Sequence, residues 1–422
     1  MNALISHAPA WLLRWVPVAT ARRWVQAQMP TSPPVPSTAP KQLLVDVSVI
    51  HRHDARTGIQ RVVRALLLQL LQSPPAGYLV KPVYASRKHG YRYAYPYFLT
   101  EPTPGAYIAQ EVVTTYGDIF LGLDLAAHLL PRHQKRLLEW KQIGVKIHII
   151  IYDLLPLHHP EWFVYKTYQN FKRWIKSISV YTDSAICISR SVENDLETLL
   201  NKKYKIPKHN ISINSFSLGS DIKSSAPSTG ISKDETDLIN LIQGKKSILM
   251  IGTIEPRKGY DIAIAALEKI WESASPHPYL IIVGCPGWRT KKLQKKIKSH
   301  QNFKKYLFWL ESSSDETLEK LYEYCSGVLV ASYGEGFGLP LIEAINKNKP
   351  VLARNLPVFM EIQSDLLDIF ETNDSQELSS IIIKWLNKKT YLKQNINCNT
   401  RTWESSKDQL SRLLFENPGN YF

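Results

Sequence analysis

A glycine-rich turn between a strand pattern and a helix pattern is the feature that most limits how this chain can fold. An apolar run at 327–332 leads into Glu335-Gly336-Phe337-Gly338-Leu339-Pro340-Leu341-Ile342-Glu343, and a helical pattern covers 339–346. Such a turn presents backbone N–H groups at a helix N-terminus, where the helix dipole favours phosphate. The glutamates at its two ends suit hydroxyl groups, because an ionised carboxylate only accepts hydrogen bonds. Phosphate and polyol together describe a nucleotide sugar; glutamates that are solvated or cap the helix are the alternative.

A second turn from strand to helix carries two adjacent cations. An apolar run at 247–254 is followed by Glu255-Pro256-Arg257-Lys258-Gly259 and by a helical pattern at 260–271. The planar fork of Arg257 and the compact charge of Lys258 together suit a diphosphate. Both turns follow strands of one βα series, so they are expected at the sheet edge where open α/β sheets bind ligands. Taken alone, the Arg-Lys pair is equally typical of a solvated basic turn.

Together, the GTIEPRKG segment and the GFGLP turn between spaced glutamates resemble family 4 (group 1) glycosyltransferases of the GT-B type, over about residues 41–416. The resemblance implies an α/β protein with two Rossmann-like parallel-sheet domains that face each other across a cleft. The EPRKG wording is similar to bacterial mannosyl- and rhamnosyltransferases of surface polysaccharide (lipopolysaccharide) biosynthesis. The implied reaction moves a hexose, with retained configuration, from a nucleotide sugar to a saccharide or lipid-linked acceptor. GDP-mannose is the first expected donor and dTDP-rhamnose the second.

Length and charge limit the remaining possibilities. With 422 residues, the chain is long enough for two domains with separate cores, and no apolar run is long enough to span a membrane. The formal net charge of +15 implies an anionic partner. Because no nucleic-acid-binding motif is present, a lipid-pyrophosphate acceptor or an anionic membrane surface is expected instead. Four cysteines without metal spacing and no convincing signal peptide favour the cytoplasm. The positive charge adds the expectation of a peripheral location on the inner face of the cytoplasmic membrane. The oligomeric state is open.

The chain divides by pattern into four segments. They are an amphipathic extension with a Pro-rich linker at 1–40, a Rossmann-like acceptor domain at 41–225, a Rossmann-like nucleotide-sugar domain at 235–400, and a helix at 401–422. The resemblance implies that this last helix crosses back to the first domain, and the stretch 220–233 is expected to connect the domains. Tryptophan and arginine in the first 29 residues suit either a membrane-interface helix, separate from the rest and broken near Pro17, or a helix docked on the protein's own surface.

Alternating periodicity predicts the elements of both domains. Strands are expected at 42–50, 78–85, 118–123, 145–152 and 184–189, and again at 247–254, 279–283, 306–310, 327–332 and 350–353. Helices are expected at 58–72, 131–143, 161–177, 191–202, 261–273, 315–325, 339–346 and 375–387. Ser313 with Glu316 resembles a capping box at the start of one helix.

The donor is expected to bind at the two turns of the second domain. Arg257 and Lys258 would hold the diphosphate with no metal, since preorganised cations and N–H groups can stabilise a leaving phosphate. Further donor contacts are assigned to Gly252, Thr253 and the backbone of Gly336, Phe337, Gly338 and Leu339. The resemblance implies that Glu335 contacts sugar hydroxyls and that Glu343 holds the ribose diol. Many relatives carry arginine at the position of Thr253, so Arg257 would take over more of that role.

The first domain offers weaker candidates. Gly58 opens a helix after the first strand and matches the family's glycine-bearing loop near donor phosphate, while Arg52 and His53 on that loop are candidates for acceptor contacts. Tyr152 and Asp153 end a very apolar strand where the family often has histidine and an acidic residue. The histidine contact is in doubt at Tyr152, which we keep as a further acceptor candidate, whereas the Asp153 carboxylate can orient the acceptor or accept its proton.

Two other functions fit the same motifs. A nucleotide-sugar epimerase on this fold would share diphosphate binding but need no acceptor, and a non-catalytic sugar-nucleotide-binding protein would keep the fold alone. Release of free nucleotide only with acceptor separates transfer from epimerisation. A dinucleotide oxidoreductase is disfavoured because no GxGxxG opens either βα series.

Overall fold

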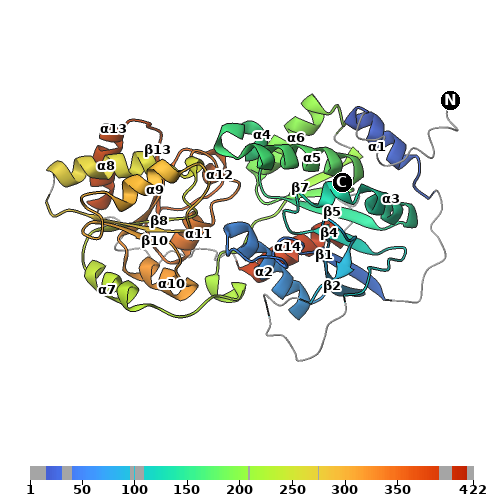
Figure 1. The fold of residues 1–422 in the computed structure, drawn as a ribbon, viewed down its shortest axis with the longest axis horizontal. Coiled ribbons are helices and arrows are strands. Elements are labelled where there is room, and N and C mark those ends of the chain that lie inside the picture. Colours follow the sequence, from blue (N-terminus) through green and yellow to red (C-terminus); the bar gives the residue numbers. More distant parts are fainter. Residues whose placement is uncertain are drawn as a thin grey trace. The chain divides into compact units, whose positions relative to one another are not determined.

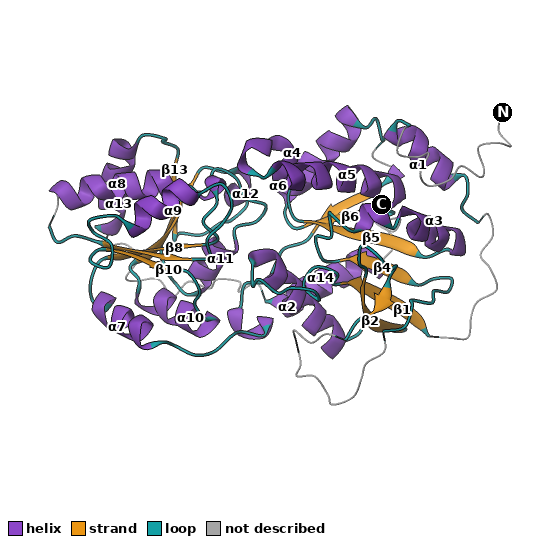
Figure 2. Ribbon diagram, viewed as in Figure 1, coloured by secondary structure: helices purple, strands orange, loops and turns teal. Residues whose placement is uncertain are grey.

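The computed structural model describes residues 16–30, 40–95, 99, 109–207, 210–273, 275–388 and 402–415. These residues form two compact units, each built around its own sheet with helices on both faces (Figures 1 and 2). Unit 1 comprises Met1–His158, Tyr165–Leu218 and Trp403–Phe422, whereas unit 2 comprises His159–Val164 and Gly219–Thr402. The C-terminal helix, α14 (Trp403–Phe415), thus belongs to unit 1, where it contacts α2 (Gly58–Gln72), although it follows unit 2 in sequence.

The sheet of unit 1 has the strand order β3-β2-β1-β4-β5-β6-β7. Its strands are β1 (Lys41–Asp46), β2 (Tyr78–Tyr84), β3 (Arg92–Tyr93), β4 (Ile119–Gly122), β5 (Lys146–Ile151), β6 (Ser184–Cys187) and β7 (Ser212–Ser215). All pairings are parallel except β2 with β3. The order reverses between β1 and β4, and ligands of such sheets bind outside the carboxyl ends of the strands at that point.

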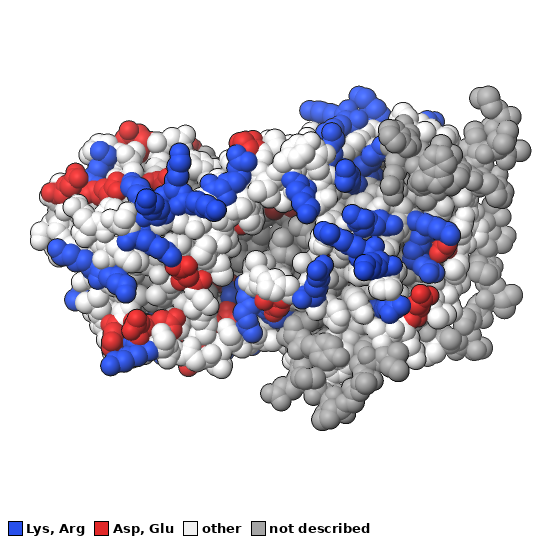
Figure 3. Space-filling view, viewed as in Figure 1, with Lys and Arg blue, Asp and Glu red and all other residues white. Residues whose placement is uncertain are grey.

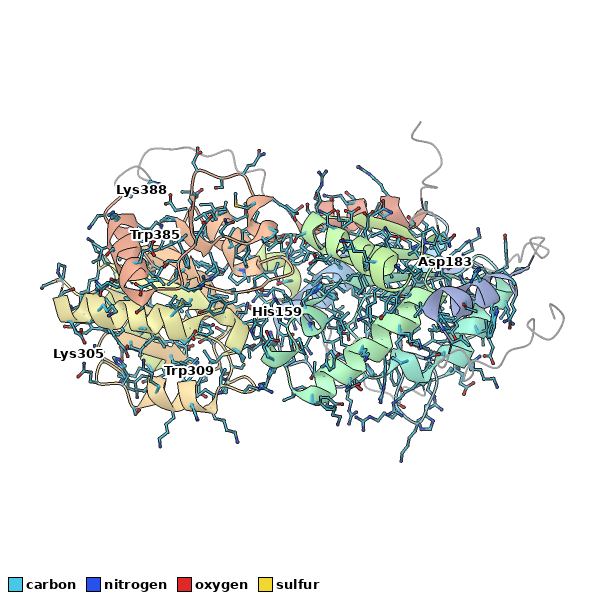
Figure 4. All side chains as sticks on the ribbon, turned by 90° about the horizontal axis from the view of Figure 1, so that it is seen from above. His159, Asp183, Lys305, Trp309, Trp385 and Lys388 are labelled. Carbon is cyan, nitrogen blue, oxygen red and sulfur yellow. The ribbon has the colours of Figure 1, made fainter. Side chains whose placement is uncertain are left out.

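Helices cover both faces of this sheet (Figure 2). They are α1 (Val18–Gln26), α2 (Gly58–Gln72), α3 (Gln134–Ile143), α4 (Leu155–His158), α5 (Tyr165–Tyr181), α6 (Arg190–Thr198) and α14 (Trp403–Phe415). Helix α2 begins in a capping box, in which the Thr57 side chain accepts from Gln60 N and the Gln60 side chain accepts from Thr57 N. The buried Lys141 pairs with the half-buried Asp183 (Asp183 is labelled in Figure 4), and the 2.6 Å contact between Nζ and Oδ1 fixes α3 to the loop before β6.

Helix α1 packs on unit 1 instead of forming a separate segment. Val18, Ala21 and Val25 join the hydrophobic core of unit 1, and α1 lies against α5. The Arg22 guanidinium is buried at the C-terminal end of α5, where Nη1 donates to the carbonyl of Thr182 at 2.9 Å and to two further carbonyls of the last turn. A cation suits the unpaired carbonyls of a helix end. For residues 18–26, the docked helix is therefore correct and the separate interfacial helix is wrong.

The sheet of unit 2 is entirely parallel, in the order β10-β9-β8-β11-β12-β13. Its strands are β8 (Ser247–Ile251), β9 (Tyr279–Val283), β10 (Leu307–Leu310), β11 (Gly327–Val330), β12 (Val351–Arg354) and β13 (Leu367–Phe370). Its helices are α7 (Lys233–Ile242), α8 (Tyr260–Ser273), α9 (Lys291–Lys298), α10 (Asp315–Tyr324), α11 (Leu339–Asn346), α12 (Pro357–Met360) and α13 (Ser375–Leu386). The order reverses between β8 and β11, which places the two motif-bearing turns next to each other.

Two tryptophans determine how helices α13 and α8 pack in unit 2. Gly327 in β11 lies under the ring of Trp385 from α13 (labelled in Figure 4), and a Cβ at Gly327 would lie 2.6 Å from that ring. Trp271 from α8 donates through Nε1 to the carbonyl of Pro278 at 2.8 Å, so its polar edge is satisfied inside the core.

Two local predictions are corrected by side-chain hydrogen bonds. The strand expected at 42–50 ends at Asp46, because Asp46 Oδ1 accepts from Ser48 N at 2.9 Å and turns the chain. Asp124 Oδ2 then accepts from Val49 N and Ile50 N at 2.8 Å each, which holds the turn. Helix α10 is capped by Ser314, whose Oγ accepts from Thr317 N, and not by the predicted Ser313.

The described residues contain no helix with the length and apolarity needed to cross a bilayer. They also hold no group of three or more His, Cys, Asp or Glu side chains placed to bind a metal ion. Of the four cysteines, Cys187 and Cys325 are buried, Cys285 is exposed, and Cys398 lies outside the described residues.

Candidate active site

The turns after β8 and β11 interlock through their backbones. Gly259 has φ +66°, and a Cβ on it would lie 2.1 Å from the carbonyl oxygen of Ala331. Tyr333 N donates to the carbonyl of Arg257 at 2.7 Å, and Tyr260 OH donates to the carbonyl of Gly252 at 2.5 Å. Only glycine fits such a close approach with positive φ. The residues on these turns are therefore held in fixed positions at the switch point of the sheet.

Arg257 and Lys258 converge on one carboxylate. Arg257 lies in a short 3₁₀ turn, Pro256–Lys258, and its Nη1 is 2.7 Å from Glu335 Oε2. Lys258 Nζ is 2.5 Å from the other oxygen, Oε1, which also accepts from Ser332 Oγ at 2.7 Å. Arg257 Nε binds Glu255 Oε2 at 2.9 Å. Two cations and two carboxylates therefore form one connected group.

The charges in this group stabilise one another. Burial alone would raise the pKa of Glu335, but the positive charges of Arg257 and Lys258 outweigh it and lower that pKa to about 2. Burial lowers the pKa of Lys258, and the adjacent Glu335 opposes this shift. Paired at 2.5 Å, Lys258 and Glu335 stay ionised at neutral pH.

Two residues that contact Arg257 and Glu335 were not predicted as site residues from the sequence. Glu255 is buried and balances Arg257, and Ser332 is buried and orients Glu335. Glu255 stands in the same motif as Arg257, so its position two residues before that cation was available as a signal. Nothing in the sequence singles out Ser332, because its role depends on where the β11 turn directs Glu335.

The other donor-site candidates lie on the same turns. The Lys258 side chain lies over Gly252, because a Cβ on that glycine would be 3.2 Å from Lys258 Cε. Thr253 is half-buried in the β8 turn. Gly336, Phe337 and Gly338 are buried and lead directly into α11, which begins at Leu339. Gly338 has φ +93° and packs against Phe359, so it too must remain glycine.

Glu343 has a partner inside unit 2. It is 2% exposed, on α11, and Tyr322 OH of α10 donates to its Oε2 at 2.7 Å. A hydroxyl donor from the neighbouring helix orients this carboxylate. The contact between Glu343 and a ribose diol stays a prediction, as does the contact between Glu335 and sugar hydroxyls.

The candidates in the first domain all lie at the carboxyl ends of unit 1 strands. Arg52 and His53 are exposed on the loop after β1, and Gly58 is exposed at the start of α2. Asp153 follows β5, is half-buried, and its Oδ1 accepts from Leu155 N at 3.0 Å. Tyr152 is buried, and its hydroxyl donates to the carbonyl of Leu123 at 2.7 Å. The structure thus gives Tyr152 a packing role inside unit 1 and does not bring it to the surface with Arg52 and Asp153.

Residues 232–403 match the family model described as glycosyl transferases group 1. The chain is 36% identical over 382 residues to the serotype-specific mannosyltransferase WbdA of Escherichia coli. The aligned region covers 89% of this chain and 45% of WbdA. It is 25% identical over 234 residues to the O-antigen chain mannosyltransferase RfbU of Salmonella typhimurium, and this aligned region covers 56% of this chain and 59% of RfbU. The chain thus spans about half the length of the WbdA proteins that it matches.

Solved structures share the arrangement of strands and helices. WaaG, a glycosyltransferase involved in lipopolysaccharide biosynthesis, has a TM-score of 0.56 at 13% identity and covers 89% of this chain and 100% of WaaG. Anabaena HepE in complex with UDP-glucose has a TM-score of 0.55 at 16% identity and covers 89% of this chain and 95% of HepE. These matches confirm the fold class predicted from the two motifs. The chain has the two-sheet GT-B fold, and its residues 232–403 form a domain of the glycosyl transferases group 1 family.

Proposed function

We propose that the protein transfers a mannose-like hexose from a nucleoside-diphosphate sugar to a saccharide or lipid-linked acceptor of bacterial surface polysaccharide. The observation that carries the proposal is the convergence of Arg257 and Lys258 on Glu335 at the switch point of unit 2. The similarity to WbdA supports mannose as the sugar and GDP-mannose as the first donor to test, with dTDP-rhamnose second.

The charge balance of the site suggests how the donor enters. Arg257 and Lys258 are already neutralised by Glu255 and Glu335, so an incoming diphosphate competes with a carboxylate for the same N–H groups. A diphosphate carries more negative charge than Glu335 and displaces it from at least one cation. The freed oxygen of Glu335 then accepts a hydrogen bond from a hydroxyl of the donor sugar. In this scheme Glu335 holds the cations in place before the donor arrives and binds the sugar afterwards.

During transfer the bond between the anomeric carbon and the diphosphate breaks, and the acceptor hydroxyl oxygen bonds to that carbon. Arg257 and Lys258 stabilise the negative charge that develops on the departing diphosphate. The acceptor proton passes to the departing phosphate, and Asp153 is proposed to orient the acceptor molecule without taking that proton. The anomeric configuration is retained, and the cations of the site replace a divalent metal.

Kinetics of charge-removing variants test this proposal. Arg257→Gln and Lys258→Gln should each lower kcat/KM for sugar transfer by about 10²–10³, the usual effect of removing one stabilising donor. Lys291→Gln, on the exposed face of α9, is the matched control and should leave transfer unchanged. A panel of nucleotide sugars identifies the donor, because ligand at ten times its dissociation constant stabilises a protein by about 1.4 kcal/mol.

Product analysis separates transfer from the other functions of such a site. Free nucleotide that appears only with acceptor supports transfer, whereas an isomerised nucleotide sugar without acceptor identifies an epimerase. Donor binding without any turnover identifies a binding protein. Full activity in EDTA tests the metal-independent chemistry, and the anomeric configuration of the product tests retention.

We further propose a cytoplasmic location with peripheral contact to an anionic membrane surface. The formal net charge of +15 supports this contact. Sedimentation with anionic vesicles, compared with neutral vesicles of the same size, tests it, and equal binding to both would contradict it.

A further inference from the structure

Four cations gather around one histidine of unit 1. The charges that act most strongly on His128 are those of Arg87, Arg52, Arg132 and Lys166. Burial and these four positive charges lower the pKa of His128, which keeps its imidazole neutral at physiological pH. The histidine is half-buried, and the four cations are exposed around it. We call these five residues the edge cluster.

The fold explains why residues so distant in sequence meet here. Arg52 lies on the loop after β1, Arg87 on the loop after β2, and His128 and Arg132 on the segment after β4. Lys166 stands in the first turn of α5, which follows β5. These four strands are parallel neighbours, so their carboxyl ends lie at one edge of the sheet. That edge includes the switch point between β1 and β4, where open α/β sheets bind ligands.

Among the described residues of unit 1, no carboxylate forms an ion pair with the cations of the edge cluster, and none of the four cations lies within 4.0 Å of a carboxylate oxygen. Asp54, on the same loop as Arg52, is already paired with Arg64 at 2.6 Å. Figure 3 shows the same imbalance more widely, since Lys and Arg dominate the visible face of unit 1.

The carboxylates that follow β1 and β4 do not compensate for this charge, and Asp153 after β5 accepts from Leu155 N through Oδ1. Asp46 and Asp124 are buried, and burial raises their pKa values to about 7 and about 6. Both are used within the β1 loop, Asp46 by Ser48 and Asp124 by backbone N–H groups. An unpaired group of cations at a ligand-binding edge is suited to an oxyanion, and three arginines suit one with several oxygens.

We propose that the edge cluster binds the phosphate or diphosphate group of the acceptor, so that the acceptor substrate is a sugar phosphate ester or a diphosphate-linked saccharide. This inference rests on the proposed function, because it assigns the second substrate of the same transfer. The donor diphosphate has its own cations, Arg257 and Lys258 of unit 2, so the edge cluster serves a different anion.

Acceptor kinetics at saturating donor test the proposal. The two probes are an alkyl diphosphate-linked mannose and the neutral alkyl mannoside with the same chain. Arg87→Gln and Arg132→Gln should each raise KM about 5- to 10-fold for the diphosphate-linked probe and less than 2-fold for the neutral one, since only the first meets the charge. The KM for the donor should not change. Lys146→Gln, at the opposite, amino end of β5, is the control and should change none of these values.

The two sources of an anionic acceptor are distinguished by a third probe. Mannose 1-phosphate, which has no lipid, should compete with the diphosphate-linked probe if the anion alone is recognised. Failure to compete, together with the expected effects of the two variants, means that the cluster recognises the lipid-linked diphosphate. Both results support a phosphate site, and they identify which acceptor uses it.

Other results would overturn the proposal. Equal KM values of the wild type for the diphosphate-linked and neutral probes would do so, as would an equal loss for both probes in Arg87→Gln. Unchanged acceptor kinetics with weaker sedimentation on anionic vesicles would assign the cluster to a membrane surface instead.

Failure of the proposed function itself is measured separately. If no transfer occurs, calorimetric titration of an alkyl diphosphate into protein saturated with its preferred nucleoside diphosphate still measures the edge cluster. Binding that is lost in Arg132→Gln and kept in Lys146→Gln supports the site without reference to transfer. An absence of binding in the wild type refutes it.

Discussion

Replacement of Glu335 by glutamine separates the two roles that we assign to this residue. The change is nearly isosteric and keeps one oxygen for Ser332, but it removes the negative charge between Arg257 and Lys258. Both cations are largely buried, with 18% and 12% of their side-chain surface exposed. Breaking a buried ion pair by removing one partner is strongly destabilising.

The size of the effect follows from the pKa of Glu335. The folded protein lowers this pKa from 4.5 to about 2, and each pKa unit corresponds to about 1.4 kcal/mol. The ionised form therefore contributes on the order of 3 kcal/mol to the free energy of unfolding at neutral pH. Because the folded pKa is lowered, this contribution is present above pH 4.5 and is lost as the pH falls towards about 2.

Chemical denaturation with and without GDP measures both consequences. At pH 7, Glu335→Gln should lose about 3 kcal/mol in the unfolding transition that GDP shifts, which identifies the transition of unit 2. The variant should bind GDP about tenfold more tightly, since the diphosphate no longer displaces a carboxylate, while sugar transfer falls sharply. Glu272→Gln, on the exposed side of α8, is the control and should alter none of these quantities.

Two outcomes would refute this reasoning. A stability within about 0.5 kcal/mol of the wild type would mean that Glu335 does not balance the buried cations. Weaker GDP binding in Glu335→Gln would mean that the carboxylate orders the cations for the diphosphate and does not compete with it.

Three further changes test the packing and the buried charges of the two units. Gly259→Ala should destabilise unit 2 by more than about 2 kcal/mol, because its Cβ would meet the Ala331 carbonyl at a positive φ; a thermal melt of the variant with and without GDP checks it. Arg22→Met should cost unit 1 about 2 kcal/mol by leaving the carbonyls at the end of α5 without their cation, measured by denaturation. Asp46→Asn should flatten the pH dependence of stability. Burial raises the pKa of Asp46 from 3.8 to about 7, so the wild type loses on the order of 4 kcal/mol as the pH rises through that window and the amide does not.

Elements with a strong local pattern were predicted closely. The helices at 58–72 and 339–346 have the predicted bounds, because a capping box starts the first and a glycine in positive φ precedes the second. The turn after β8 is likewise local, since proline and glycine within a few residues determine it. Such signals depend on neighbours in sequence and so can be identified without a structure.

Elements that depend on distant packing were missed. Strands β7 and β13 are edge strands, half-buried for most of their length, and their sequences lack a strong apolar pattern. Helix α7 follows directly on the polar stretch expected to connect the domains, and a capping box between Ser232 and Glu235 starts it. The destination of α1 was also undetermined, because an amphipathic pattern does not specify which apolar surface the helix will cover.

The candidate site shows the same division between local and distant information. The sequence identified Arg257, Lys258 and Glu335 as residues of one site, with the glutamate assigned to the sugar and the cations to the diphosphate. It gave no sign that the glutamate pairs with both cations. Only the fold brings Glu335 within 2.7 Å of Arg257 and within 2.5 Å of Lys258. The internal neutralisation of the site is a property of the turns after two adjacent strands, and periodicity carries no information about it.

Arg257 and Lys258 of unit 2 are paired with carboxylates, whereas the cations of the edge cluster in unit 1 have no such partner in the part of the chain that the structure describes. This difference predicts that salt affects donor binding and acceptor binding unequally. In unit 2, Arg257 and Lys258 are paired with carboxylates, so a donor diphosphate gains only the difference between two ionic partners. In unit 1 the cations of the edge cluster are exposed and without a carboxylate partner among the described residues, so an acceptor phosphate meets their full charge in high dielectric. Salt screens exposed charges more strongly than buried ones. Raising the ionic strength from about 0.01 M to about 0.15 M shortens the Debye length from about 30 Å to about 8 Å, and it should weaken acceptor binding much more than donor binding.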